Sequence, residues 1–229
     1  MGMQDGLGDG SRLTEAIEDY LKAIFHLSRE RSLVSNQQLA GHLEVNPASV
    51  SGMLKRLAEL DLVCYERYRG ATLTDGGLQA ALCIVRRHRL LEQLLVEKLG
   101  LSWDHVHEVA EQWEHTLSPE VEAHIAELLG HPTTDPHGAP IPTPQGYLPQ
   151  REQVRLSTLR AGQRGLITEV SDGDPALLRY LEDRTLQPGT EVDVVDVAPL
   201  AETMTVRVAE SRQVVALSAA EHVFLLSQA

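Results

Sequence analysis

Acidic and imidazole side chains recur at helical spacing in the middle of this sequence. Counting from His107, further donor residues follow after four, seven and eight positions: Glu111, Glu114 and His115. A helix with about 3.6 residues per turn returns such offsets to one face, so these four side chains share one stripe. His88 and Glu92, four residues apart in the preceding segment, project to one side of a helix in the same way. Carboxylates and imidazoles pooled by two packed helices would bind a divalent metal ion.

Histidine is concentrated in the same part of the chain, since seven of the ten histidines lie between His88 and His137. Any one of the donor side chains also fits a solvated helix face, and the metal interpretation depends on their joint spacing. The other histidines have no such spacing, and we assign them to surface or core positions: His26, His42, His105, His124, His131, His137 and His222.

The chain before these donors has the pattern of a helix-turn-helix. Apolar residues recur at three and four positions over 15–30, which predicts an amphipathic helix. Two further helices fit residues 36–43 and 47–60, because a turn at 44–46 separates them and Pro47 suits the first position of a helix. Two short helices joined by a tight turn favour a DNA-binding motif.

Two strand-like stretches, 62–68 and 71–74, follow this motif and predict a hairpin wing. In such a protein the second helix of the motif enters the major groove, where short polar side chains meet bases and cations meet phosphate. The residues that fit these roles are Asn46, Ser49, Ser51, Gly52, Lys55, Arg56, Arg67 and Arg69. The same cations also fit an ordinary solvated surface, so the pattern alone leaves DNA binding and a plain helical hairpin open.

The rest of the chain changes from helix to strand. Helices are predicted over 75–99, 103–117 and 119–129. Six of the eleven prolines then fall between Gly130 and Pro149, a composition that favours an extended linker over a packed element. Strand-length β-branched runs beyond it predict a small β-barrel: 166–170, 191–197, 205–208 and 214–217. We predict three domains: a DNA-binding domain over 1–74, a helical domain over 75–149 that includes the linker 130–149, and a barrel over 150–229.

Composition narrows the classes of function. No stretch of the 229 residues reaches the ~18 apolar residues that a membrane helix needs. Acids outnumber bases by 33 to 20, a formal charge of −13, which disfavours nucleic acid unless the bases cluster as they do on the predicted reading surface. The first ten residues lack the basic and apolar blocks of a secretory signal peptide, and two cysteines are too few for a disulfide framework. Both features predict a cytoplasmic protein.

Two other kinds of protein stay open as alternatives. A metallohydrolase would use the same donors, although the sequence contains no HExxH motif, phosphate-binding loop or nucleophile elbow. A winged-helix regulator that senses an organic ligand would leave the acidic helices merely solvated.

The order of these features resembles the diphtheria toxin repressor family of metal-dependent transcriptional regulators. The most specific stretches are RRHRLLEQLL from Arg86, VHEVAEQWEHTLSPEVE from Val106 and HPTTDPHGAPIP from His131, with weaker support from IEDYLKAIFHL in the first helix. The resemblance implies a mainly α protein with β structure: an N-terminal winged helix-turn-helix, a helical dimerisation domain and a C-terminal SH3-like, FeoA-type small β-barrel. By matching position, the primary metal ligands are Asp19, Glu111, Glu114 and His115. An ancillary site is implied at His88, Glu92 and His107, with a barrel carboxylate from Asp172 or Asp174.

The resemblance also implies a metal and partners. Iron-responsive members carry sulfur ligands where this chain has Asp19 and Glu111, and manganese-responsive members carry carboxylates there. We therefore expect Mn²⁺, with Fe²⁺ as the alternative and Zn²⁺ or Cd²⁺ as ions that would also fit. Manganese regulators have a second acid three residues after the first-helix aspartate, and Lys22 at that position argues against a bridged two-metal primary centre. We expect a homodimer that, when metal-loaded, binds palindromic double-stranded operator DNA and represses manganese-uptake genes, with no membrane partner.

Overall fold

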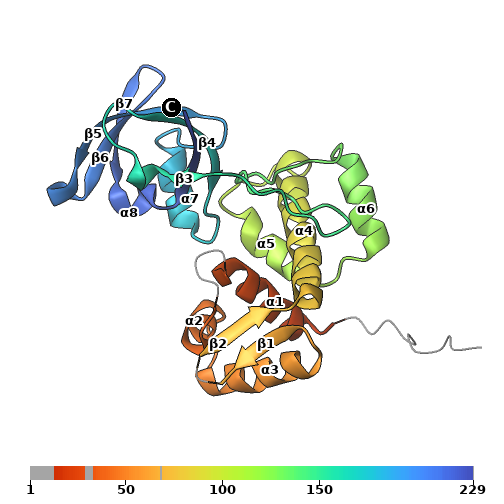
Figure 1. Ribbon diagram of the computed structural model, residues 1–229. Coiled ribbons are helices and arrows are strands. Elements are labelled where there is room, and N and C mark those ends of the chain that lie inside the picture. The colour runs from red at the N-terminus through yellow and green to blue at the C-terminus, as the bar shows by residue number, and fades with distance from the viewer. Residues whose placement is uncertain (1–12, 29–32, 68, 229) are drawn as a thin grey trace, which may run out of the picture. The chain divides into compact units, whose positions relative to one another are not determined.

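A computed structural model describes residues 13–28, 33–67 and 69–228 of the chain (Figure 1). The first ten residues, the predicted helical residues 29–30 and the predicted strand residue Tyr68 lie outside these ranges. The chain forms two compact units, residues 1–84 and 85–229. The boundary between them falls inside one long helix, α4 (Asp75–Glu97).

The first unit has the predicted winged helix-turn-helix fold. Its elements are α1 (Glu15–Ser28), α2 (Asn36–His42), α3 (Pro47–Glu59), β1 (Val63–Glu66) and β2 (Gly70–Leu73). Ser35 and Gln38 form a reciprocal capping box at the start of α2. Asn46 caps α3, and Pro47 occupies its first turn, where a missing N–H costs nothing. The antiparallel pairing of β1 with β2 makes the wing.

Gly70 fixes the start of β2 against the rest of the first unit. Its φ is +141°, and a Cβ at this position would lie 2.3 Å from the Val34 carbonyl oxygen. The backbone approaches this closely because Ala71 and Val34 exchange hydrogen bonds of 2.8 and 3.0 Å. Only glycine fits such an approach, so the wing and the segment before α2 are held together at this point.

Three helices open the second unit: α4 from Val85 onward, α5 (Val106–Glu114) and α6 (Pro119–Leu128). Ser118 caps α6, and Pro119 occupies its first turn. The buried residues that hold the helices together are Leu90, Leu91, Leu95, Val106, Ala110, Ile125 and Ala126. This packing sets the donor-bearing faces of α4 and α5 opposite one another.

The proline-rich segment 130–149 is extended, but the prediction that it is an unpacked linker is wrong. Residues 137–142 are buried in the second unit. Two arginines of α4 hold it: Arg86 Nη1 donates to the Pro142 carbonyl at 2.7 Å, and Arg89 Nη1 donates to the Pro140 carbonyl at 2.5 Å. Prolines supply carbonyl oxygens without N–H donors of their own, so a buried proline segment needs donors from elsewhere. The guanidinium groups meet that need.

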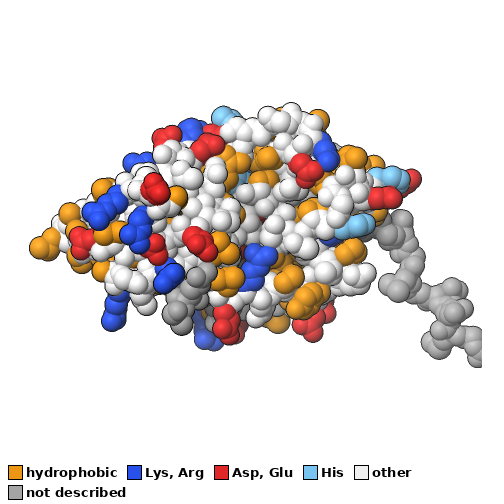
Figure 2. Space-filling view, turned by 90° about the horizontal axis from the view of Figure 1, so that it is seen from above, with side chains coloured by type: hydrophobic (Ala, Val, Ile, Leu, Met, Phe, Trp, Pro, Cys, Tyr) orange, Lys and Arg blue, Asp and Glu red, His pale blue; other side chains and the backbone are white. Residues whose placement is uncertain are grey.

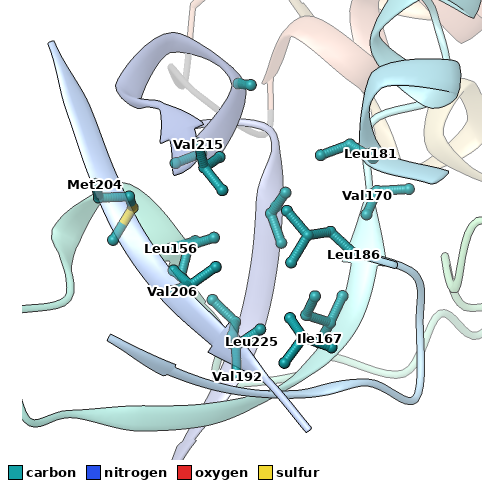
Figure 3. Close-up of a cluster of buried hydrophobic side chains, with 14 of the residues drawn as sticks. Leu156, Ile167, Val170, Leu181, Leu186, Val192, Met204, Val206, Val215 and Leu225 are labelled. Carbon is teal, nitrogen blue, oxygen red and sulfur yellow. The ribbon is translucent and has the colours of Figure 1, made fainter. Parts of the chain in front are cut away.

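The barrel is a curved antiparallel sheet of six strands in the order β3-β8-β4-β5-β6-β7. The strands are β3 (Val154–Arg155), β4 (Arg164–Val170), β5 (Glu191–Ala198), β6 (Thr203–Val208), β7 (Ser211–Ala216) and β8 (Val223–Gln228). Alternate side chains such as Val192, Met204 and Val206 point into one shared core (Figure 3). Helix α7 (Pro175–Glu182) contributes Leu181 to this core. Three 3-10 or α turns, Leu156–Thr158, Pro199–Ala201 and Leu217–Ala220, complete the domain.

No helix in the described ranges combines the length and the apolar character that crossing a bilayer requires. On the face that Figure 2 shows, basic and acidic side chains are interspersed with one another and with hydrophobic side chains.

Candidate metal centre and DNA-binding surface

The facing sides of α4 and α5 bring the predicted ancillary donors together. His88 Nε2 lies 3.1 Å from Glu92 Oε1 and 3.1 Å from His107 Nδ1. His107 Nδ1 lies 3.3 Å from Glu92 Oε1 and 3.9 Å from Asp172 Oδ2. One donor atom from each of these four residues falls within a common 4.8 Å. Two nitrogens and two carboxylate oxygens at this spacing form a cluster that fits one divalent cation.

The barrel supplies one of its two candidate carboxylates to this cluster. Asp172 lies in the loop after β4 and is the residue that approaches His107. Asp174 instead caps α7, where its Oδ1 accepts a hydrogen bond from the Ala176 N–H at 2.8 Å. Among the described residues, the donor clusters include Asp172 and not Asp174. The structure therefore favours Asp172 of the two.

The carboxylates predicted for the primary site lie next to the ancillary donors. His88 Nδ1 lies 2.5 Å from Glu114 Oε2 and 3.9 Å from Glu111 Oε1. Glu114 is fully buried, and its other oxygen, Oε1, lies 3.5 Å from His115 Nε2. Within the second unit, three of the four predicted primary ligands therefore adjoin one another. Asp19 belongs to α1 of the first unit, and its part in the site stays a prediction of the family resemblance.

A further buried donor group was missed by sequence reasoning. Glu92, Asp135 and His137 bring donor atoms within 4.8 Å of one another, and each residue is at most 4% exposed. The sequence predicts only a surface or core position for His137, because this residue lies on no helical stripe. Its Nε2 contacts the Trp103 carbonyl oxygen at 2.8 Å, while its Nδ1 lies 3.8 Å from Glu92 Oε2. The signal that could have found it is HPTTDPHGAPIP, the stretch that carried the family resemblance.

Three atoms of this group have no hydrogen-bond partner: Glu92 Oε2, Asp135 Oδ2 and His137 Nδ1. Burying polar atoms without partners is costly, and such atoms mark a place where a water molecule or an ion is expected. Arg89 Nε lies 3.4 Å from Asp135 Oδ2, an ion pair that offsets part of the charge. The residues present therefore fit a divalent cation beside Glu92.

The electrostatics of the cluster hold protons on imidazoles and keep Glu92 ionised. Burial raises the pKa of Glu92, but the charge of His88 and the closeness of the His107 and His137 imidazoles outweigh it and hold the pKa well below its usual value. Burial lowers the pKa of His137, yet the nearby Glu92 carboxylate raises it to about 9. Burial and the Glu92 charge raise the pKa of Asp135 to about 7. A bound cation would take the place of these protons.

The predicted DNA-reading residues lie on α3, at its N-cap and in the wing. Ser49, Gly52, Lys55 and Arg56 are exposed or nearly so on α3, and the two wing arginines are exposed as well. Arg56 pairs with Glu59 at 3.2 Å, and Arg69 pairs with Glu66. Asn46 has a structural role that the sequence prediction did not include, because its Oδ1 accepts the Ala48 N–H at 2.9 Å and caps α3. The other positions remain predicted contacts.

A pocket of about 390 Å³ lies between α2, α3 and the wing. The predicted residues Ser51, Lys55, Arg67 and Arg69 line it together with four that sequence reasoning did not single out: Ser35, Asn36, Gln37 and Tyr65. Asn36 Nδ2 donates to Ser51 Oγ at 2.8 Å and to Tyr65 Oη at 3.4 Å. One amide thus links α2 to the recognition helix and to the wing. Three cations around polar side chains make a surface suited to a phosphate backbone.

A winged helix-turn-helix joined to a buried carboxylate and imidazole cluster defines a metal-dependent DNA-binding regulator. Comparisons with known proteins agree. Residues 12–71 match the iron-dependent repressor N-terminal DNA-binding domain, residues 74–143 its metal-binding and dimerisation domain, and residues 154–225 the FeoA domain.

Relatives match over most of the chain. The iron-dependent repressor IdeR of Mycobacterium tuberculosis is 33% identical over 196 residues, which cover 80% of this chain and 85% of the relative. A solved manganese-dependent transcriptional repressor in complex with manganese has a TM-score of 0.88 and 35% identity, covering 93% of this chain and 100% of that chain. A solved structure of ScaR with bound Zn²⁺ has a TM-score of 0.78 and 30% identity, and the match covers 92% of this chain and 98% of that chain. The chain belongs to the iron-dependent repressor family, whose members are DNA-binding transcriptional repressors and not enzymes.

Proposed function

We propose that this protein is a Mn²⁺-responsive transcriptional repressor that works in the cytoplasm as a homodimer. In this proposal residues 1–74 read a palindromic operator in double-stranded DNA. Residues 75–149 hold the metal and the two-fold contact, and residues 150–229 form the barrel that adds Asp172 to the ancillary site. The genes we expect it to repress are those for manganese uptake.

The observation that carries the proposal is the chemistry of the donor set. The clusters in the described residues contain carboxylates and imidazoles and no sulfur atom. Both cysteines, Cys64 and Cys83, are exposed and outside these clusters. Hard oxygen donors suit Mn²⁺, which lies at the weak end of the divalent affinity series and is selected by ligand type and geometry.

The proposed switch follows from charge. In the metal-free protein, Glu111 and Glu114 add negative charge that would disfavour the approach of a third carboxylate, Asp19. A bound Mn²⁺ would supply the two positive charges that let these carboxylates share one site. Asp19, on the helix that supports the reading head, would then be tied to α5. The two recognition helices of a dimer would be held about one DNA turn apart, as a palindromic operator requires.

The proposal is tested by operator selection and titration with the full-length protein. Duplexes enriched from a random library in the presence of Mn²⁺ give the operator, and fluorescence anisotropy then measures its affinity with Mn²⁺, Fe²⁺, Zn²⁺ or chelator. We expect tight binding with Mn²⁺ that chelator abolishes. Glu114→Ala should lose the metal dependence, whereas Glu120→Ala, on the exposed start of α6, should keep it. Operator binding that ignores both chelator and Glu114→Ala would contradict the proposal.

Fe²⁺ is the second candidate metal. The observation that favours it is the 33% identity with a relative named as iron-dependent. The parallel titration separates the two, because an iron regulator would bind its operator under anaerobic Fe²⁺ at concentrations at which Mn²⁺ has no effect.

A further inference from the structure

The loop between α4 and α5 is attached to the barrel. Trp103 lies in this loop, yet its side chain is only 8% exposed and belongs to the buried core of the barrel. Its indole Nε1 donates to Glu182 Oε2 at 3.3 Å. The next residue, Asp104, is 3% exposed, and its Oδ2 accepts a hydrogen bond from Arg179 Nη1 at 2.8 Å. We call these four residues the α7 clamp, because Arg179 and Glu182 both belong to α7.

The segment that carries Asp172 is fixed on both sides. Two residues before it, the Val170 N–H donates to the His137 carbonyl at 2.9 Å. Two residues after it, Asp174 caps α7. The α7 clamp then attaches the second half of the same short helix, through Arg179 and Glu182, to the α4–α5 loop. Asp172 is therefore positioned by α7 and its attachments, while the other ancillary donors are positioned by α4 and α5.

We propose that the α7 clamp is a positioning device that sets Asp172 into the ancillary metal site. This inference rests on the proposed function, because it concerns a ligand of the metal that the protein would sense. A carboxylate carried on a separate domain must lose orientational freedom on binding a metal, and docking that domain beforehand removes much of this cost. Groups that hold a ligand in place in this way commonly change metal affinity by about 10–100-fold.

The burial of Asp104 indicates a role in orientation. Removing a carboxylate from water is costly, and a buried ion pair offers little net stability over an apolar contact. The barrel already has a large apolar core of its own, which includes Ile167, Leu178 and Val206. A charged pair at its margin adds direction, since the Arg179 Nη1–Asp104 Oδ2 hydrogen bond of 2.8 Å ties α7 to one point of the α4–α5 loop. That attachment is the one that brings Asp172 to His107.

The test is a Mn²⁺ titration of the full-length chain by calorimetry, with Arg179→Ala as the variant. Arg179 is chosen because its side chain is 54% exposed, whereas removing Trp103 would also leave a hole in the barrel core. Glu92→Ala identifies which binding step belongs to the ancillary site. We expect Arg179→Ala to weaken that step about tenfold and to leave the other step unchanged. Arg179→Lys should restore part of the affinity.

The control is Arg207→Ala, which removes the surface ion pair with Asp193 from the same barrel. It should leave both binding steps as they are. In an Asp172→Ala background, Arg179→Ala should cause no further loss of metal affinity, because the ligand it positions is gone. Equal affinities for wild type and Arg179→Ala, or fully additive losses in the double variant, would overturn the inference alone. A wild-type chain with no second Mn²⁺ site would overturn it together with the proposed ancillary site.

Discussion

His88 Nδ1 lies 2.5 Å from Glu114 Oε2, and the same imidazole places its Nε2 3.1 Å from Glu92 Oε1. His88 thus contacts a predicted primary ligand with one ring nitrogen and the ancillary donors with the other. His107 repeats the arrangement, with Nδ1 toward Glu92 and Nε2 3.6 Å from Glu111 Oε1. An imidazole that gives one nitrogen to a metal donates the N–H of the other to a carboxylate and orients it. The two imidazoles therefore connect the proposed metal positions.

Replacing His88 should weaken Mn²⁺ binding at both positions. In His88→Ala the ancillary site loses a donor, and Glu114 loses the group that orients it, so we expect losses of about 10–100-fold in each binding step. Calorimetric titration of the full-length chain measures both steps. His124→Ala, an exposed histidine of α6, is the matched control and should bind as wild type. If His88→Ala loses only the ancillary binding step, the contact between His88 and Glu114 does not contribute to Mn²⁺ affinity at the primary site.

Metal should stabilise the second unit by mass action. A ligand present at a hundred times its dissociation constant, bound only by the folded state, adds about 2.7 kcal/mol to the free energy of unfolding. The buried, unpartnered atoms of Glu92, Asp135 and His137 give the cation a place only in the folded protein. We expect a higher melting temperature with Mn²⁺ than with chelator, measured by calorimetry, and a smaller gain in Glu92→Ala. An unchanged melting temperature would argue against a metal at this cluster.

The metal-free protein should lose stability as the pH rises above neutral. Burial opposes protonation of His137, but the Glu92 carboxylate favours it and raises the pKa of His137 to about 9. In the unfolded chain the pKa of a histidine is about 6.5. A raised histidine pKa gives stability that is complete below pH ~6.5 and lost through pH ~9, on the order of 3 kcal/mol. Burial raises the pKa of Asp135 to about 7, so Asp135 acts in the same direction from about pH 4 to 7. Urea unfolding in chelator measures the slope, and His137→Gln should flatten it above pH 7.

Asn36 should contribute to operator affinity without affecting metal binding. Its side-chain amide donates hydrogen bonds to Ser51 of the recognition helix and to Tyr65 of the wing. Asn36→Ala removes both hydrogen bonds, so the helix and the wing lose this connection. We expect operator affinity to fall by about tenfold, since losing a hydrogen-bonded partner costs on the order of 1 kcal/mol or more. Lys55→Ala is the comparison: it should lower the salt dependence of binding by about one phosphate contact, which Asn36→Ala should not. Unchanged affinity for Asn36→Ala would contradict this role.

Much of the fold was predictable because local rules agree with the tertiary structure. Pro47 and Pro119 each begin a helix, as the fixed φ of proline indicates. The helix α7 was not predicted, because it is only eight residues long and lies between strands in the sequence. The strands β3 and β8 were missed as well, and they pair with each other across the whole length of the barrel sequence. Such pairing depends on partners that are remote in the chain.

The metal cluster was predictable only where its donors share a helix. His88 with Glu92, and His107 with Glu111, are four residues apart and repeat at helical period. Asp135 and His137 lie in an extended proline segment with no period to reveal them, and their burial depends on Arg86 and Arg89. Residues brought into a site by tertiary contacts alone leave no spacing in the sequence.

Gly138 should be the residue of the proline segment that is least tolerant of substitution. Its φ is +86°, and a Cβ would lie 2.0 Å from the Thr168 carbonyl oxygen on β4, a backbone atom that cannot turn aside. Gly130, at the end of α6, has a similar φ of +71° and open space around its Cβ position. Gly130→Ala should therefore cost only the left-handed conformation, about 1 kcal/mol, whereas Gly138→Ala must also push the segment away from β4.

That displacement would move His137, which is adjacent in the chain and whose backbone carbonyl accepts a hydrogen bond from the Val170 N–H. We expect Gly138→Ala to lower the free energy of unfolding by several kcal/mol in urea titrations, clearly more than Gly130→Ala, and to weaken Mn²⁺ binding as well. Gly130→Ala should leave metal affinity unchanged, because neither neighbour of Gly130 belongs to a donor cluster. Equal losses of stability in the two variants would show that the close approach to Thr168 is not what holds this segment, and with it His137, in place.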